Sequence, residues 1–138
     1  DSCRGFFEID VKEVNAAKFN AMTRMQATAL CPLVTLAVDL AKSEIKPALL
    51  AGGFDISKPT FWLMEGLTMY LTPEVNASIL GQIQQFQASA PQALCCGFLG
   101  ETKNAGVPFH KAPTEMHDWV VDFGFSNCKV SNFGDTDL

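Results

Sequence analysis

Residues 33–39 read LVTLAVD, a short apolar run that ends at an acid. A run of this length that is rich in β-branched residues predicts a buried strand. Two further runs have the same form, GFFEID at residues 5–10 and TFWLME at residues 60–65. We therefore expect three strands, each followed by a carboxylate at its carboxyl end.

Helical patterns separate these strands. Apolar residues recur at helical spacing from Val14 to Met25. Thr72, Pro73 and Glu74 form a strong helix start, because Thr caps a helix, Pro suits its first position and an acid favours its first turn. The other expected elements are a short helix at residues 44–51 that stops at Gly52-Gly53, a strand at 93–98, a helix from Thr114 to Phe123 followed by Gly124, and a final strand at 128–133.

This alternation of strands and helices predicts an α/β fold. Short apolar strands that are separated by helices indicate a parallel or mostly parallel sheet, covered by helices on both faces. In open sheets of this kind, ligands bind beyond the carboxyl ends of the strands. Asp10, Asp39 and Glu65 therefore form a candidate site. Singly, each acid also fits a helix cap or a turn, and only their joint position favours a site.

Composition narrows the class of protein. The chain has 138 residues, which suits one domain over residues 1–138, and 48% of them are hydrophobic. The net charge is −5 and there is no Lys/Arg cluster, so a nucleic-acid partner is not expected. No apolar run is long enough to span a membrane. The five cysteines show no C-x-x-C spacing, which argues against zinc and for reduced thiols, hence a cytoplasmic or other reducing intracellular compartment.

Several blocks resemble the family of leucine carboxyl methyltransferases and related bacterial O-methyltransferases. The most specific is WLMEGLTMYLTPE at residues 62–74, which resembles the family's W-x-x-E-G-x-x-x-Y-L-x-P-E pattern. Weaker blocks occur in the family's order at residues 7–18, 38–40, 51–60 and 118–125. The resemblance implies a Rossmann-like class I methyltransferase sheet and S-adenosyl-L-methionine as cofactor.

The resemblance also assigns roles to single residues. Asp10 matches the acid that accepts hydrogen bonds from the ribose hydroxyls of the cofactor, and Asp39 matches the acid near the adenine amino group. The backbone at Leu40 would lie beside the adenine ring, and Glu65 would lie near the methionine end. Tyr70 fits either a wall of the acceptor pocket or a half-buried aromatic residue at a helix start.

The implied activity is transfer of a methyl group to a carboxylate, on a protein C-terminus or a small molecule. Methyl transfer to a carboxylate needs no base, and its rate comes from alignment and from exclusion of water. We therefore assign no catalytic residue. His110 and His117 are expected to be ordinary surface or capping histidines, and no metal site is expected.

One part of the family pattern has no counterpart in the sequence. The family's first strand and its G-x-G-x-D turn are absent, so we expect an incomplete sheet whose strands fall into two groups with unpaired edges. We expect the protein to extend upstream of Asp1; the alternatives are that another chain covers these edges or that the fold is reshaped. The alternative to an enzyme is therefore a non-catalytic structural or binding subunit of a larger complex. A nucleotide-linked oxidoreductase ranks last, because it does not explain residues 62–74.

Overall fold

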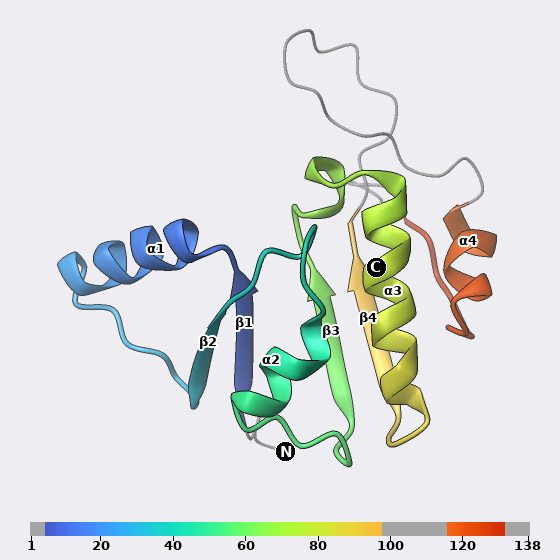
Figure 1. The fold of residues 1–138 in the computed structure, drawn as a ribbon, viewed down its shortest axis with the longest axis horizontal. Helices are drawn as coiled ribbons and strands as arrows, with labels where there is room; N and C mark the ends of the chain where they lie inside the picture. The colour runs from blue at the N-terminus through green and yellow to red at the C-terminus, as the bar shows by residue number, and fades with distance from the viewer. Residues whose placement is uncertain (1–4, 98–115, 132–138) are drawn as a thin grey trace, which may run out of the picture. The chain divides into compact units, whose positions relative to one another are not determined.

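The structure, a computed structural model, describes residues 5–97 and 116–131 (Figure 1). It divides into two compact units, Asp1–Ile56 and Ser57–Leu138, and each is described here by itself. The expectation of a single domain over the whole chain stays a prediction. None of the described helices is both long and apolar enough to cross a membrane.

In the first unit, β1 (Phe6–Asp10) and β2 (Leu33–Ala37) form a parallel pair in which Asp10 lies opposite Ala37. The helix α1 (Lys12–Arg24) connects them, since parallel neighbours need a crossover connection. Both strands and this helix were predicted. The helical spacing does not mark a buried face, however, because no residue of α1 is buried.

The helix α2 (Ile45–Ala51) follows β2, and its Ile45 and Leu49 are buried. It ends at the predicted pair of glycines. A Cβ atom at Gly52 would lie only 2.9 Å from Leu36 Cδ2, so the absence of a side chain there lets the helix end approach β2 closely. Gly53 has a φ of +85°, a conformation that glycine adopts without steric cost.

In the second unit, β3 (Thr60–Met64) and β4 (Gln92–Cys96) form a second parallel pair, with Met64 opposite Cys96. The short 3₁₀ helix η1 (Thr68–Tyr70) and the helix α3 (Pro73–Gln87) connect them. The predicted helix start is confirmed, because the Thr72 side chain accepts a hydrogen bond from the Val75 N–H at 3.4 Å.

The core of this unit lies between α3 and the strand pair. Ile79, Leu80, Ile83 and Phe86 are all buried on α3. The Trp62 ring packs against Phe86 with ring centroids 5.3 Å apart, and its Nε1 donates to Gln92 Oε1 at 2.7 Å. An indole that is packed on one side and hydrogen-bonded at its nitrogen suits a partly buried position.

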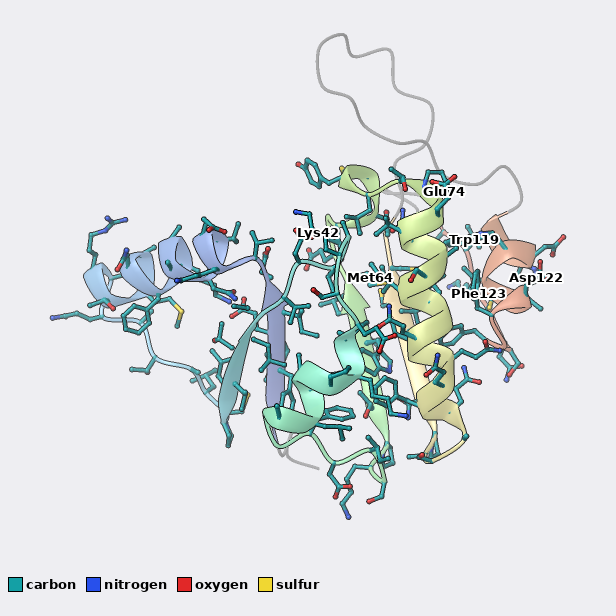
Figure 2. The ribbon with its side chains drawn as sticks, in the orientation of Figure 1. Lys42, Met64, Glu74, Trp119, Asp122 and Phe123 are labelled. Atoms are coloured by element: carbon teal, nitrogen blue, oxygen red, sulfur yellow. The ribbon has the colours of Figure 1, made fainter. Side chains whose placement is uncertain are left out.

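The helix α4 (Met116–Asp122) lies beside α3 (Figure 1). A Cβ atom at Gly81 of α3 would lie 4.0 Å from the Phe123 ring, which Figure 2 labels. Gly124 has a φ of +81°, as expected for a glycine just beyond a helix end. Thr114, the predicted cap of this helix, lies outside the described residues.

The predicted final strand at residues 128–133 is wrong for its described part. Cys128–Ser131 is irregular, and the remaining two positions lie outside the described residues. Asn127 has a φ of +58°, and the Cys128 thiol donates to the Phe125 carbonyl at 3.3 Å, so the chain turns here instead of extending. The predicted fourth strand begins one residue earlier than expected, at Gln92, and ends at Cys96.

The four strands therefore fall into two pairs, β1 with β2 and β3 with β4, as expected from the sequence. Within the described ranges, each strand has only one neighbour, so each pair carries unpaired edges. That both pairs belong to one Rossmann-like sheet stays a prediction.

The two adjacent cysteines of β4 lie in different environments. Cys95 is exposed, whereas Cys96 is half-buried. Burial, followed by the charges of Cys95 and Cys128, raises the pKa of the Cys96 thiol to about 11. Neither thiol, nor that of Cys128, forms a disulfide bond among the described residues.

We expect Cys96 to resist alkylation at pH 8, because its raised pKa keeps the thiol in its unreactive protonated form. Cys95 should react first, because its thiol is exposed. Iodoacetamide labelling of Cys95→Ser and Cys96→Ser variants, followed by mass spectrometry, measures each thiol alone. Equal rates in the two variants would contradict the burial of Cys96.

Candidate functional site

Asp10 lies where β1 ends and the chain turns toward α1. Its Oδ1 accepts a hydrogen bond from the Val11 N–H at 2.7 Å, and its carbonyl accepts one from the Val38 N–H at 2.9 Å. Across the described part of the chain, no donor is bonded to its Oδ2. One carboxylate oxygen is therefore held by the backbone, while the other keeps its acceptor capacity for a ligand.

Asn15 joins the ends of the two strands. Its Nδ2 donates to the Asp10 carbonyl at 3.1 Å and to the Leu36 carbonyl at 3.0 Å. No pattern in the sequence predicted a role for Asn15. A faint signal exists, because Asn is unfavourable inside a helix unless its side chain bonds to the backbone. That signal does not say which carbonyls it would meet.

Asp39 follows β2 and holds the turn that comes after it. Its Oδ1 accepts from the Ala41 N–H at 3.0 Å, and its Oδ2 accepts from Lys42 Nζ at 2.7 Å (Lys42 is labelled in Figure 2). The Lys42 hydrogen bond, then the Ala41 hydrogen bond, lowers the pKa of Asp39 below its ordinary value. Asp39 is thus a turn residue as well as a site candidate.

Leu40 contributes a backbone donor. Its side chain is half-buried, and no described residue accepts a hydrogen bond from its N–H. A backbone N–H without a partner can bind an acceptor such as a ring nitrogen. This donor lies next to the Asp39 carboxylate in the chain, so an acceptor and a donor stand side by side.

The structure brings Asp10 and Asp39 to the same end of one strand pair. Asp10 lies opposite Ala37, and Asp39 comes two residues later on the neighbouring strand. Because neighbouring strands are about 4.8 Å apart, the two acids and the Leu40 backbone share one edge. This part of the predicted site is therefore assembled within the first unit (Figure 1).

Glu65 and Tyr70 lie in the second unit, so their placement relative to Asp10 and Asp39 stays a prediction. Glu65 follows β3 and is exposed, and Gly66 after it has a φ of +60°. Tyr70 is 63% exposed in η1. The half-buried alternative for Tyr70 is therefore wrong, and its role in an acceptor pocket is untested.

Two polar residues missed by the sequence analysis fix the segment between Glu65 and α3. The Thr68 hydroxyl donates to the Gly97 carbonyl at 2.5 Å. Asn76 Nδ2 donates to the Thr68 carbonyl at 2.9 Å and to the Leu71 carbonyl at 3.3 Å. Both side chains are buried, so these bonds hold the turn after β3 against the end of β4.

No metal-binding group is seen among the described residues, and the hollow found in the first unit lies away from the candidate site. Over residues 5–97 and 116–131, no group of three or more His, Cys, Asp or Glu side chains could hold a metal ion. His117 Nδ1 lies 2.9 Å from the neighbouring Asp118 Oδ1 on the surface, and His110 lies outside the described residues. A hollow of about 630 Å³ beneath α1 is lined by Phe19, Met22 and Leu33 among others, but by none of the predicted site residues.

Comparison with known proteins gives a consistent result. The sequence model of the leucine carboxyl methyltransferase family matches residues 4–84. A Mycobacterium ulcerans (strain Agy99) protein, provisionally named an S-adenosyl-L-methionine-dependent methyltransferase, is 39% identical over 89 residues, which cover 64% of this chain and 28% of that protein.

Proteins with the same provisional name occur in related organisms. One from Mycobacterium avium (strain 104) is 42% identical over 77 residues, 56% of this chain and 24% of that protein. One from Mycolicibacterium smegmatis (strain ATCC 700084 / mc(2)155) is 39% identical over 82 residues, 59% of this chain and 27% of that protein. The matched part of the chain thus spans about a quarter of the length of these relatives.

We expect the substitution Lys42→Met to raise the pKa of Asp39, because it removes the ammonium that favours the charged carboxylate. The pKa can be measured by NMR titration of the Asp39 carboxyl carbon. Lys12→Met is the control, since Lys12 is exposed and takes no part in the shift of Asp39. An unchanged titration in the Lys42 variant would mean that the ion pair does not form in solution.

Proposed function

The chain belongs to the leucine carboxyl methyltransferase family, and on this premise we propose that it provides the adenosine-binding part of an S-adenosylmethionine-dependent O-methyltransferase. The proposed acceptor is a carboxylate, on a protein C-terminus or on a small molecule. The single observation that carries the proposal is the position of Asp10 and Asp39 at one edge of the β1–β2 pair.

The polar groups at this edge suit an adenosine. The free Oδ2 of Asp10 is an acceptor only, and ribose hydroxyls can donate to it. The Leu40 N–H, which has no partner among the described residues, suits a nitrogen acceptor of the adenine ring. Each oxygen of Asp39 already accepts one hydrogen bond, but a carboxylate oxygen has two lone pairs and can accept a second from the adenine amino group.

The residues of this chain would act by binding and orientation. When bound, S-adenosylmethionine supplies a methyl group on a sulfonium that is already activated. Asp10 and Asp39 hold the nucleoside, which fixes where the reactive end of the cofactor points. A carboxylate acceptor is already a nucleophile, so no side chain has to remove a proton. We propose that Glu65 meets the ammonium at the methionine end and that Tyr70 lines the acceptor pocket.

The proposal is tested by calorimetry of the full-length protein with S-adenosylhomocysteine. Asp10→Ala should weaken binding by roughly tenfold or more, because it removes a charged acceptor from the ribose. Glu13→Ala is the matched control, since Glu13 is an exposed acid on α1 three residues away in sequence. Absence of binding by the wild type, or equal affinity for wild type and Asp10→Ala, would overturn the proposal.

One observation favours a second candidate, a non-catalytic subunit held in a larger complex. Within its own unit each described strand has a single neighbour, and α1 has no buried residue, so another chain is one way to cover these edges and this helix face. This candidate predicts that the purified full-length protein associates or aggregates without its partner. Size-exclusion chromatography with light scattering measures this, and a stable monomer would count against the candidate.

A further inference from the structure

We propose that Asn15 is a positioning residue that sets the spacing between the strand ends that carry Asp10 and Asp39. The proposal rests on the proposed function, because it concerns how those two acids are presented to one nucleoside. Asn15 does not contact the ligand. It instead sets the geometry of the edge of the strand pair to which the ligand would bind.

The hydrogen bonds of Asn15 are divided between the two strands. A side-chain amide has two N–H donors, and here one donates to Asp10 of β1 and the other to Leu36 of β2. The lengths, 3.1 and 3.0 Å, are both ordinary for N–H···O bonds. Both donors are satisfied only while the two carbonyls stay at a fixed separation, so the amide acts as a clamp.

The clamp lies where the backbone pairing of the strands ends. The Val38 N–H donates to the Asp10 carbonyl at 2.9 Å, just beyond the last paired residues, Asp10 and Ala37. After this point the chain turns into α1 on one side and into the Asp39 turn on the other. Beyond Val38, within the described residues, no backbone hydrogen bond links these two turns.

Asn15 is one of three half-buried residues of α1, with Ala21 and Met22 near the other end of the helix. Asn15 is half-buried, whereas every other residue from Lys12 to Asn20 is exposed. This helix therefore contributes little apolar packing to the strand pair. Among the first nine residues of α1, the half-buried one is the polar Asn15. Its side chain donates hydrogen bonds to two carbonyls at the strand ends.

A fixed separation matters because two acids must meet one rigid ligand. A misplacement of about 1 Å in a binding constellation can cost as much as a hundredfold in rate, and precise sites hold their groups within about 0.5 Å. Loss of the clamp leaves both carboxylates chemically intact but lets their spacing vary. The loss should therefore appear in nucleoside affinity and should depend on the presence of both acids.

The first test compares Asn15→Ala with Asn20→Ala in the full-length protein. Asn20 is an exposed Asn on the same helix with no hydrogen-bond partner within the described residues, so it controls for helix propensity. We expect Asn15→Ala to weaken binding of S-adenosylhomocysteine roughly tenfold, as two hydrogen bonds are lost. Asn20→Ala should bind as the wild type does. Wild-type affinity in Asn15→Ala would overturn the proposal.

A double-mutant cycle with Asp10→Ala separates positioning from general structural damage. If Asn15 acts through the acids, its substitution should weaken binding less once Asp10 is absent. Independent, multiplicative losses would overturn the proposal. Asn15→Asp keeps the size of the side chain and removes its donors, so it replaces Asn15→Ala if that variant does not fold. Failure of both variants to fold would make Asn15 structural and the proposal wrong.

A ligand-free measurement distinguishes this proposal from the proposed function. Amide hydrogen exchange at Val38 should be faster in Asn15→Ala than in the wild type and unchanged in Asn20→Ala. If the wild type fails to bind S-adenosylhomocysteine, the proposed function falls, and the exchange at Val38 alone then decides whether Asn15 clamps the strand ends. Unchanged exchange in Asn15→Ala would overturn the clamp itself.

Discussion

The parallel pairing of β1 with β2 is the constraint on which the candidate site depends. The register that sets Asp10 opposite Ala37 also sets Asp39 two residues beyond the same edge. A shift of one residue would turn every side chain of a strand to its other face. The pairing ends at the bond from the Val38 N–H to the Asp10 carbonyl, and Asn15 holds the two strand ends just there.

Asp39 holds a turn in the structure and is also one of the two acids of the proposed adenosine site. Its carboxylate holds Ala41 and Lys42, so the loop after β2 has a defined shape before any ligand arrives. Lys42 has 80% of its side chain exposed, and ion pairs in such settings contribute little because water screens them. The ion pair with Lys42 therefore adds little to the stability of this turn.

Local signals in the sequence were enough to predict most of the elements. Short apolar runs with β-branched or aromatic residues located β2 and β3, Thr72 and Pro73 located the start of α3, and glycines located the ends of α2 and α4. These signals depend on neighbours along the chain. The prediction of a final strand was wrong because a strand needs a pairing partner elsewhere in the chain. An apolar run alone does not supply that partner.

The position of Asp10 and Asp39 at one edge of a strand pair could be predicted, but the polar side chains that fix the strand ends and turns could not. Asp10 and Asp39 were found because acids follow apolar runs, and parallel strands bring their ends together. Asn15, Thr68 and Asn76 use hydrogen bonds to carbonyls that are five to 29 residues away, and such bonds leave no periodic pattern in the sequence. The sequence also did not predict that α1 is exposed. Helical spacing identifies the apolar face of a helix but not the element that packs against it.

The most direct measurement of the central claim is a crystal structure of the full-length protein with S-adenosylhomocysteine. The account predicts that the Asp10 carboxylate accepts the ribose hydroxyls and that the Leu40 N–H meets the adenine ring at the same edge of the β1–β2 pair. An adenosine bound away from Asp10 and Asp39, with both carboxylates left to solvent, would contradict it.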